Sequence, residues 1–565
     1  MGVCFGLLII CLTGYPPENS ITSNYKEVFM ELDARILIVD DDDVVISIIR
    51  NILKRDDYLT DYCYNGEDAL QKVINGNFDL VLLDVHMGKG LDGYETCRLI
   101  NQAKPDLPVI LVTANQDDES VNKGFEAGSS DYIKKPVSRL ELLARVNNTI
   151  TLKRAEHRNL QLIDTLRKDL STAANIQQTM LPKWVYLDNE ILFSSYYEPC
   201  EAVGGDLFDR IILSSSKYVV YIGDISGHGV QAALLMSAVK STIKLMVESY
   251  PDEKTMAELF TKLNERLYND LYIRHNYLTL LMGVVDLEQK EFRFLNAGHP
   301  PLIRINKETH TITVMDQKGS LPLGWMPGTK YDNNDIDHIA LDPKDMYLLF
   351  TDGIYECTDP QGNQFGMEGL KQLLKDASMS DTCITLPFKI LDYLEKNEYE
   401  TASDDFSLFS FQVLKDPFAK ANAQDLIKHH HIVLRSALKE VGKTAQECES
   451  LVLRWTGDSH LAAKVELIVD EFLNNIISYG YDYQEDSEIV LGFRFYPDMI
   501  SIRFWDKGIE WIPQNLSYSI TDPYDFELDG LHSSGRGVKI IMSMSNRFQR
   551  KRFGNLNETK VEIDL

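Results

Sequence analysis

The sequence has 565 residues, a length that predicts three or four domains. Its 44% hydrophobic and 25% charged residues are typical of ordinary soluble protein. A formal net charge of −28 argues against direct DNA binding, because a phosphate backbone requires a basic face. The eight cysteines form no C-x-x-C pair, so the spacing indicates neither a zinc site nor a disulfide framework and favours a reducing cytoplasm.

The first twenty residues contain an apolar run of about a dozen, too short to span a bilayer comfortably. They also lack the basic segment that opens a signal peptide. Two interpretations stay open, a short interfacial anchor or a start assigned too early, and Met30 directly before a complete domain favours the second. We expect residues 1–32 to be disordered or absent from the native chain.

From Arg35 onward, short apolar strands alternate with amphipathic helices. Strands are predicted at residues 35–41, 79–87, 108–114 and 130–136. Continuous apolar strands separated by helices predict a parallel sheet that is buried on both faces. Ligands of such sheets bind at the carboxyl ends of the strands. Five polar residues lie at those ends: Asp40, Asp41, Asp84, Thr113 and Lys135.

This arrangement resembles the response-regulator receiver family over residues 33–150, which implies a doubly wound parallel sheet. The resemblance implies that Asp84 accepts a phosphoryl group from a histidine kinase or phosphotransfer protein. The other matched positions are Asp40 and Asp41 for Mg²⁺, Thr113 and Lys135 for the phosphoryl group, and Tyr132 for the aromatic switch. Mg²⁺ and the Lys135 ammonium would offset the repulsion between a carboxylate and a phosphoryl group. A degenerate receiver that only folds is the alternative, although every chemical position is filled.

Residues 138–182 have leucine or isoleucine at helical spacing and few helix breakers before Pro182. They predict a long amphipathic helix, which includes the linker at residues 151–190 and offers a coiled coil for a homodimer. Residues 173–182 resemble the segment before the phosphatase in the stress-type family, where such helices carry an input signal. His157 would be the phosphosite of a hybrid histidine kinase, but no acidic residue follows it and the Pro-containing turn of such a site is missing, so we interpret it as a solvated helix residue.

Four aspartates each close an apolar run, and glycine accompanies several of them: Asp206, Asp224, Asp352 and Asp404. Carboxylates on tight backbone suit hard divalent cations such as Mg²⁺ or Mn²⁺. A single aspartate at a strand end is usually a turn residue. Four in this order predict a site for two metal ions.

The segments GGD, DISGHG, AGHPP, LPLG, TDG and DD-F-S-L resemble the sporulation- and stress-type branch of the PPM (protein phosphatase 2C) superfamily over residues 191–415. The resemblance implies a β-sandwich flanked by helices that hydrolyses phosphoserine or phosphothreonine with two Mn²⁺ or Mg²⁺. It assigns the metals to the four aspartates and the backbone carbonyl of Ile225. Asp209 and Asp405 would accept hydrogen bonds behind the metals. His228 would protonate the leaving oxygen, although its spacing differs from that of eukaryotic members.

Three segments carry the chemistry after residue 430. Residues 464–481 predict a helix on which Glu471 and Asn475 share one face. Residues 501–511 predict a strand that ends in Asp506 and Gly508. Residues 533–544 predict a glycine-rich turn before a helix, where phosphates can meet backbone N–H groups. Histidines 429–431 begin another strand and are read as an accidental cluster in preference to a metal site.

These segments resemble the GHKL ATPase superfamily over residues 425–565, in particular its anti-sigma-factor serine-kinase branch, with a Bergerat-type α/β sandwich. The resemblance implies that Asn475 holds the Mg²⁺ of ATP and that Asp506 binds the adenine amino group. Gly508, Gly535 and Gly537 would shape the lid over the phosphates. Glu471 would be the general base toward a serine. Tyr479 replaces a frequent histidine of that branch, and a domain that only sequesters a sigma or anti-sigma factor is the alternative.

The sequence therefore predicts a multidomain α/β and α+β chain that resembles partner-switching response regulators of gamma-proteobacteria. The phosphatase and kinase would act in opposition on one serine of a STAS-type anti-sigma-factor antagonist in the cytoplasm. Phosphorylation of Asp84 would stimulate the phosphatase through the linker helix, because the receiver abuts that helix and not the kinase.

Overall fold

The computed structural model describes residues 34–565 except 89, 115–117, 189, 250–254, 273–275, 316–319, 377–378, 380, 402–403, 415–427, 511–517 and 520–535. The prediction for residues 1–32 falls outside this part of the chain. The chain forms two compact units, which divide between Lys168 and Asp169.

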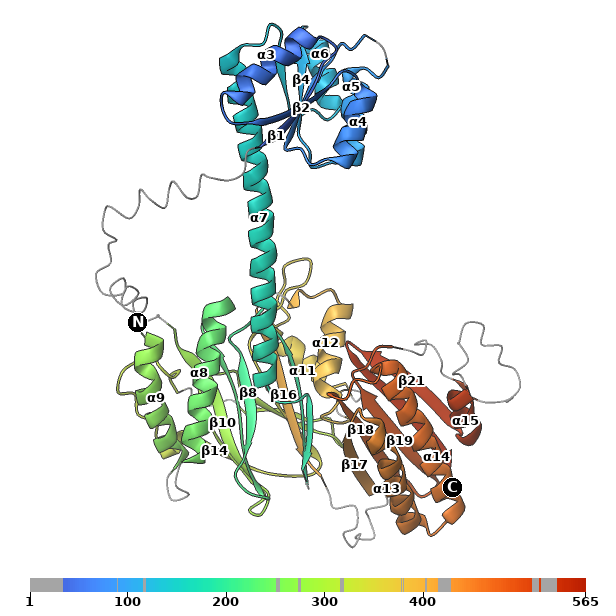
Figure 1. Cartoon of the computed structure of the whole chain (residues 1–565). Helices are drawn as coiled ribbons and strands as arrows, with labels where there is room; N and C mark the ends of the chain where they lie inside the picture. The colour runs from blue at the N-terminus through green and yellow to red at the C-terminus, as the bar shows by residue number, and fades with distance from the viewer. Residues whose placement is uncertain are drawn as a thin grey trace, which may run out of the picture. The chain divides into compact units, whose positions relative to one another are not determined.

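The first unit is built on a five-stranded parallel sheet in the order β2-β1-β3-β4-β5 (Figure 1). The strands are β1 (Arg35–Val39), β2 (Leu59–Cys63), β3 (Leu80–Asp84), β4 (Val109–Thr113) and β5 (Asp131–Lys134). They alternate with helices α3 (Asp43–Lys54), α4 (Gly66–Asn75), α5 (Gly93–Ala103) and α6 (Asp118–Glu126). Leu83 and its neighbour Leu82 belong to different apolar clusters, because successive strand residues point to opposite faces. The sheet is thus buried on both sides, which confirms the doubly wound fold.

Strand β2 is the one element of this sheet that the sequence did not predict. Its residues, LTDYC, are mostly half-buried, since β2 pairs with β1 alone at the edge of the sheet. An edge strand is not required to be apolar on both faces, so the continuous apolar pattern of the central strands is missing.

Helix α7 (Arg139–Met180) is a single helix of 42 residues, as the spacing of apolar residues predicted. Leu142, Val146 and Ile150 in its first turns are buried in an apolar cluster of the receiver sheet. Farther along, Leu160 and Leu166 are exposed. The coiled coil stays a prediction.

The second unit begins with a β-sandwich. Its five-stranded sheet has the order β14-β11-β10-β9-β8 and its six-stranded sheet the order β13-β12-β15-β16-β7-β6. The strands are β6 (Val185–Asp188), β7 (Ile191–Glu198), β8 (Leu207–Ile212), β9 (Lys217–Ile225), β10 (Leu278–Asp286), β11 (Glu291–Ala297), β12 (Leu302–Asn306), β13 (Ile312–Met315), β14 (Ile336–Ala340), β15 (Asp345–Phe350) and β16 (Phe406–Val413). Aromatic residues of both sheets, such as Phe292 of β11 and Phe411 of β16, form the core between them.

Helices cover the outer faces of the sandwich. The apolar residues of α8 (Gly229–Glu248) and α9 (Met256–Tyr272) pack with those of β9 and β10. The other sheet carries α10 (Gly353–Glu356), α11 (Gly366–Leu374) and α12 (Leu386–Lys396), and a 3-10 turn (Asn333–Asp335) precedes β14. Within the described ranges, α8 alone is long and apolar enough to cross a membrane, and its buried side chains belong to the core of this fold.

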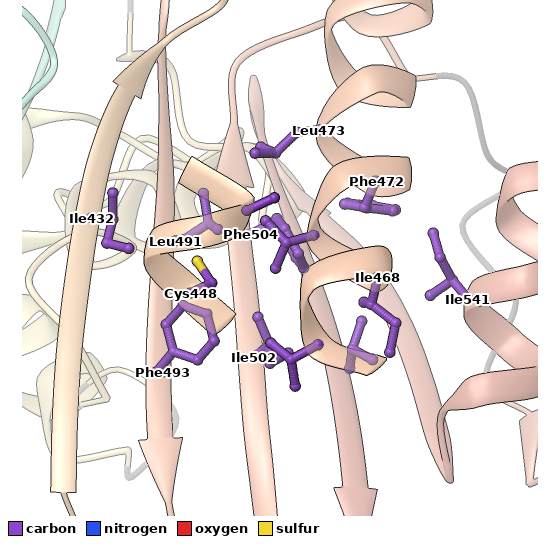
Figure 2. Packing of buried hydrophobic residues seen from close by; sticks show 14 of the residues in the cluster. Ile432, Cys448, Ile468, Phe472, Leu473, Leu491, Phe493, Ile502, Phe504 and Ile541 are labelled. Atoms are coloured by element: carbon purple, nitrogen blue, oxygen red, sulfur yellow. The ribbon is translucent and has the colours of Figure 1, made fainter. Parts of the chain in front are cut away.

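The last part of the second unit is a six-stranded sheet in the order β17-β18-β19-β22-β21-β20. Its strands are β17 (Lys428–Arg435), β18 (Glu488–Phe495), β19 (Met499–Asp506), β20 (Tyr518–Ser519), β21 (Arg547–Phe553) and β22 (Leu556–Asp564). Helices α13 (Leu438–Thr456), α14 (Ser459–Asn475) and α15 (Arg536–Met544) cover one face, and a π-helical turn (Ile476–Gly480) extends α14. Figure 2 shows how Phe472 of α14 packs against Phe504 of β19, with ring centroids 4.6 Å apart.

The opposite face of this sheet is also covered. Val490, Trp505 and Leu556 are buried in the same apolar cluster as Phe388 and Leu391 of α12. Because strand residues alternate between faces, Phe504 packs under the helices while Trp505 packs against the sandwich. The sandwich and the last sheet therefore share an apolar core within the second unit.

Candidate functional site

A carboxylate pocket lies at the carboxyl ends of β1 and β3. Asp40 and Asp84 are buried, and Lys135 Nζ lies 2.8 Å from Asp40 Oδ2 and 3.0 Å from Asp84 Oδ1. Asp41 Oδ2 accepts a hydrogen bond from the Gly88 amide (2.9 Å). One oxygen each from Asp40, Asp41 and Asp84 lies within 4.8 Å of the others. Three carboxylate oxygens at this spacing fit a hard divalent cation.

The electrostatics of this pocket follow from its burial. Burial raises the pKa of Asp84, and the nearby Asp40 carboxylate raises it further. Burial alone would lower the pKa of Lys135, but its hydrogen bonds to Asp40 and Asp84 outweigh that effect and raise it. Lys135 is therefore a fixed positive charge beside Asp84, where an incoming phosphoryl group would bring negative charge.

The two other predicted receiver residues lie beside a small gap. Thr113 and Tyr132 both line it, together with Tyr94 and Ser120. The Tyr132 ring contacts Phe125 edge-on, with centroids 6.3 Å apart. Thr113 lies at the end of β4 and is buried, so Asp40, Asp41, Asp84, Thr113 and Lys135 all lie at the carboxyl ends of the strands, whereas Tyr132 lies within β5.

In the second unit, strand pairing brings two pairs of aspartates together. The start of β8 pairs with the end of β9 through Leu207 and Gly223, which places Asp206 near Asp224. The end of β15 pairs with the start of β16 through Phe350 and Leu408, which places Asp352 near Asp404. The antiparallel registers thus explain each pair, and hydrogen bonds from Thr351 to Asp206 and from the Gly205 amide to Asp405 join the two pairs across the two sheets.

Burial and mutual repulsion of the carboxylates raise the pKa values in this acidic cluster. Burial raises the pKa of Asp224 to about 8, reinforced by Asp352, Asp404 and Asp405. Burial likewise raises the pKa of Asp352 to about 6, with Asp404 as the next cause. Asp206 is fully buried, and burial followed by the Asp224 charge raises its pKa well above the ordinary value. A divalent cation would relieve this repulsion, so the donor set fits the metals that the fold implies.

Glu356 belongs to this cluster and was missed by the sequence analysis. One oxygen each of Asp352, Glu356 and Asp404 lies within 4.8 Å of the others. The signal was available, because Glu356 follows Asp352 by four residues and the short helix α10 places both on one side.

Glycines make room for the backbone around the acidic cluster. A Cβ atom on Gly204 would lie 2.3 Å from Asp405 Oδ2, and one on Gly353 would lie 2.3 Å from the Asp405 carbonyl oxygen. A Cβ atom on Gly205 would lie 2.9 Å from the carbonyl oxygen of Ile225. The GGD and TDG segments therefore require glycine because Asp405 and the Ile225 carbonyl approach so closely.

Asp405 itself holds the loop before β8. It accepts hydrogen bonds from the Cys200 amide (2.9 Å) and the Gly205 amide (2.5 Å). Asp206 accepts one from Thr351 Oγ1 (2.8 Å). These bonds hold the loop in place and orient the Asp206 carboxylate.

The remaining two candidates of this part have different surroundings. Asp209 Oδ2 lies 2.6 Å from Lys240 Nζ on α8, and Lys240 also donates to the Phe208 carbonyl oxygen (2.9 Å). His228 is exposed, and its Nδ1 lies 2.7 Å from Glu201 Oε1. Burial raises the pKa of Asp404, and His228 acts weakly in the opposite direction, so this histidine lies near the acidic cluster.

The end of α7 contacts the same loop. Gln177 is buried, its Nε2 donates to the Gly204 carbonyl oxygen (2.7 Å), and its Oε1 accepts from the Gly204 amide (3.2 Å). The Tyr197 hydroxyl also donates to Gln177 Oε1 (3.4 Å). The glutamine lies within the 173–182 segment of the sequence analysis, but its role was not foreseen.

Asp506, at the end of β19, has no exposed surface. Its Oδ1 accepts hydrogen bonds from the Gly508 amide (3.0 Å) and from Asn557 Nδ2 (2.8 Å). Its Oδ2 lies 3.5 Å from Arg550 Nη2 and makes no hydrogen bond within the described residues. A buried carboxylate oxygen without a hydrogen bond fits an adenine amino group as the missing donor.

Asn475 and Glu471 lie on the last turns of α14, where Asn475 is buried and Glu471 half-buried. The Nδ2 atom of Asn475 has no hydrogen-bond partner in the described part of the chain. This nitrogen can donate to an acceptor such as a phosphate oxygen, whereas a Mg²⁺ ion would bind the amide oxygen of the same side chain. Gly508 packs against the Gly480 backbone, since a Cβ atom there would lie 2.8 Å from three of its atoms. Gly537 lies at the start of α15, and Gly535 is outside the described residues.

Asn557 was missed because only the pairing of β19 with β22 places it opposite Asp506. Two further residues singled out earlier, His157 and Tyr479, take ordinary places. His157 lies on exposed α7 surface, with Nε2 at 2.9 Å from Gln161 Nε2. Tyr479 lies in the π-helical turn after Asn475 and is 41% exposed.

Comparisons with known proteins agree with this geometry. Residues 36–147 match the family model "Response regulator receiver domain", residues 214–414 match "Stage II sporulation protein E (SpoIIE)", and residues 434–563 match "Histidine kinase-like ATPase domain". The transcriptional regulatory protein ResD of Bacillus subtilis is 41% identical over 114 residues, which cover 20% of this chain and 47% of ResD. Protein IcfG of Synechocystis is 26% identical over 234 residues, which cover 37% of this chain and 36% of IcfG.

The chain thus spans less than half the length of these two relatives. Among solved structures, that of the RsbU and RsbW domains of a Mycobacterium tuberculosis protein is similar to this chain. The match covers 67% of this chain and 95% of the solved one, at 18% identity and a TM-score of 0.37. The chain therefore contains a response regulator receiver domain, a SpoIIE-type phosphatase domain and a histidine kinase-like ATPase domain, in that order.

Proposed function

We propose that this chain is a cytoplasmic partner-switching regulator. Its phosphatase and kinase would act in opposition on one serine of a STAS-type anti-sigma-factor antagonist, and a histidine kinase or phosphotransfer protein would phosphorylate Asp84. The observation that carries the proposal is the acidic cluster of Asp206, Asp224, Asp352 and Asp404, built where two sheets meet. It lies in the same chain as a receiver domain and a histidine kinase-like ATPase domain.

In the phosphatase, the four aspartates and the Ile225 carbonyl would hold two Mn²⁺ or Mg²⁺ ions, with Glu356 beside them. The cations would supply charge neutralisation for the phosphoryl oxygens and a lowered pKa for water. The exposed His228, oriented by Glu201, would donate a proton to the departing serine oxygen. Asp405 would keep the loop in position through the Cys200 and Gly205 amides.

In the ATPase domain, Asp506 Oδ2 would accept a hydrogen bond from the adenine amino group, and Asn475 would hold the Mg²⁺ of ATP. Glu471 lies one helical turn before Asn475 and would take the proton of the substrate serine. The serine oxygen then bonds to the γ-phosphorus while the bond to the β–γ bridging oxygen breaks and ADP leaves. The receiver would use Lys135 to offset phosphoryl charge at Asp84.

The route of control rests on α7. This helix carries Gln177, which is hydrogen-bonded to both sides of Gly204, two residues before Asp206. A small rotation or shift of the helix would therefore move the loop that bears a metal-binding aspartate. We propose that phosphorylation of Asp84 stimulates the phosphatase by stabilising this contact, and the helix surface beyond Ile150 would pair with a second copy.

One experiment tests both activities. Purified full-length protein is incubated with Mn²⁺ and a phosphorylated STAS protein, or with Mg·ATP and the unphosphorylated form, each with and without acetyl phosphate. We expect phosphoserine loss in the first reaction, faster after phosphorylation of Asp84, and phosphoserine formation in the second. Asp84→Ala should abolish the acceleration, and Asn475→Ala should abolish phosphoserine formation.

The same assay separates the second candidate function, a sequestering domain without turnover. The wild type would then bind a partner protein tightly in the presence of ATP but transfer no phosphate. Stimulation of the kinase reaction by acetyl phosphate, with an unchanged phosphatase rate, would show that the route through α7 is wrong.

A further inference from the structure

The AGHPP motif, residues 297–301, takes no part in the proposed chemistry, yet it lies at the end of the sandwich that carries the acidic cluster. It joins β11 of one sheet to β12 of the other. The end of β11 pairs with the start of β10, which pairs with the end of β9 and so lies beside Asp224. The start of β12 pairs with the end of β15, which leads to Asp352. The motif therefore crosses from the strands around Asp224 to the strand before Asp352.

The backbone of this crossing is held by its neighbours. Asn296 is buried, its Nδ2 donates to the His299 carbonyl oxygen (2.8 Å), and its Oδ1 accepts from the His299 amide (2.7 Å). Gly298 has a φ of +72°, and a Cβ atom on it would lie 2.7 Å from Pro322 Cγ in the LPLG motif. The two motifs thus pack on each other, and hydrogen bonds at both peptide groups of His299 set the direction of its side chain.

The imidazole of His299 is buried and interacts with both sheets. Its Nδ1 lies 2.9 Å from the hydroxyl Oγ1 of Thr279 on β10. Thr279 is the direct strand partner of Asp224, and its hydroxyl lies 3.4 Å from the Asp224 carbonyl oxygen. On the other sheet, the backbone carbonyl of Phe350 interacts with the imidazole and raises its pKa, although less than burial lowers it. Asp352 follows Phe350 by two residues, so the ring lies between the partner strand of one aspartate and the strand that leads to another.

The hydrogen-bonding capacity of the ring fits a link between the sheets. Burial lowers the pKa of His299 to about 3, so the ring is neutral and has one donor and one acceptor nitrogen. The Thr279 hydroxyl has a single proton, and Nδ1 is the nearer of its two acceptors. Nδ1 therefore accepts this proton, which leaves the proton of the ring on Nε2 for the Phe350 carbonyl. This second contact is the looser one, because Nε2 makes no hydrogen bond of regular geometry among the described residues.

The link made by His299 supplements one that joins the same sheets at a different aspartate. Thr351 Oγ1 donates a hydrogen bond to Asp206 (2.8 Å), so the end of β15 is already connected to one aspartate of the other sheet. His299 adds a connection from β15 to the strand partner of the second, Asp224. After burial, Asp352 is the next cause that raises the pKa of Asp224, so these two carboxylates are neighbours. The strands that position them are thus joined beside the acidic cluster itself.

We propose that His299 is a positioning residue of the phosphatase, which ties β10 to β15 and thereby fixes the distance between Asp224 and Asp352. The affinity of the acidic cluster for divalent cations depends on this distance, although His299 itself touches neither a metal ion nor the substrate. The inference rests on the proposed two-metal phosphatase site. Residues that orient metal ligands in this way typically contribute a factor of about 10–100 to metal affinity or activity.

Mn²⁺ binding by the full-length chain tests this role, measured by isothermal titration calorimetry without nucleotide. The parent protein and every variant carry Asp41→Asn, which weakens the metal site of the receiver. Thr279→Val keeps the shape of the side chain but removes its hydroxyl, and His299→Leu removes the ring nitrogens. We expect both to bind Mn²⁺ about tenfold more weakly than the parent. Thr279→Ser, which retains the hydroxyl, and His338→Leu, at an exposed histidine of β14 in the same sandwich, should bind like the parent.

Phosphatase kinetics separate positioning from general damage to the fold. The Mn²⁺ concentration for half-maximal activity should rise in Thr279→Val, whereas at saturating Mn²⁺ this variant should regain most of the parent kcat with an unchanged KM for the phosphoserine substrate. Circular dichroism checks that each variant is folded. Should His299→Leu unfold, the two Thr279 variants decide by themselves.

The inference is overturned if folded Thr279→Val binds Mn²⁺ as tightly as the parent, or if Thr279→Ser loses as much affinity as Thr279→Val. A parent protein that binds no Mn²⁺ overturns both this inference and the proposed phosphatase. Tight Mn²⁺ binding without hydrolysis of a phosphorylated STAS protein contradicts the proposed function alone, because the binding data then still decide on His299.

Discussion

Gln177 and Gly204 hold each other by two hydrogen bonds, one in each direction between the side-chain amide and the peptide groups. The side chain is buried, and the peptide that it holds lies two residues before Asp206. This contact places the last turn of a 42-residue helix directly against the loop that enters the acidic cluster.

Gln177→Ala should lower the phosphatase rate. The substitution leaves two backbone groups of Gly204 unpaired in a buried place, which costs about 1–3 kcal/mol for each buried group. We expect a phosphatase rate about tenfold lower and a loss of stimulation through Asp84, measured as phosphate release from a phosphorylated STAS protein. Gln178→Ala, at the exposed neighbouring position, is the control, and equal rates for the two variants would contradict a role for the contact.

Glu356→Gln should weaken metal binding by the phosphatase. The residue shares a carboxylate triad with Asp352 and Asp404, so its charge contributes to the attraction for a divalent cation. The Mn²⁺ concentration for half-maximal activity should rise about tenfold, as for other groups that support metal ligands. Glu368→Gln, an exposed carboxylate on α11, should leave this concentration unchanged. If both variants titrate like the wild type, Glu356 lies outside the working site.

Asn475→Ala should remove the Mg²⁺ dependence of ATP binding. Asn475 is buried at the end of α14, and its amide oxygen is the atom that would bind the ion. Calorimetry with and without Mg²⁺ should give a clear difference in ATP affinity for the wild type and none for the variant. Asn474→Ala is the matched control, because Asn474 bonds to Asp470 (3.1 Å) on the same helix. A variant that still responds to Mg²⁺ would assign the ion to other residues.

Lys507 should make the stability of the folded chain depend on alkaline pH. Burial lowers its pKa to about 8 from an ordinary 10.5, and its ammonium lies 5.3 Å from the centroid of the Phe388 ring. Between these two values the unfolded chain binds more protons than the folded chain, so the stability contribution of this group rises with pH. Below about pH 8 the full destabilising effect is present, and above 10.5 it is gone.

Calorimetry of Lys507→Met across this pH window checks the assignment. The variant should lack the part of the rise that Lys507 contributes, so the gap between its unfolding midpoint and that of the wild type should narrow as the pH increases. Lys443→Met, at an exposed position of α13, should follow the wild type. A constant gap between Lys507→Met and the wild type would show that this lysine titrates normally.

Site residues could be predicted best from the sequence where they stand at the ends of predicted strands. Asp40, Asp84 and Lys135 end predicted strands of one parallel sheet, so the fold itself brings their side chains together. The long helix was predictable because its pattern continues without a breaker to Pro182. By contrast, strand β2 was not predicted, because a strand at the edge of a sheet need not be apolar on both faces.

Relationships across the sheet could not be read from local pattern. Asn557 meets Asp506 through strand pairing over 51 positions, and no spacing rule connects the two. Likewise, the apolar residues of β19 indicate that both faces of its sheet are buried, but they do not indicate which elements cover each face. Only the folded second unit shows that Trp505 packs with the phosphatase cluster while Phe504 packs under the helices.

One apolar contact limits how the domains of such a chain can be separated or exchanged. It joins the last sheet to α12 through Trp505, Val490, Leu556 and Phe388. A gene fragment that stops after Leu414, or one that begins at Lys428, would expose an apolar surface that the complete chain keeps from water. Such fragments are expected to aggregate or to recruit an outside protein to the bare face. Exchange of the kinase-like module between relatives would therefore succeed only when the matching surface of α12 is carried along.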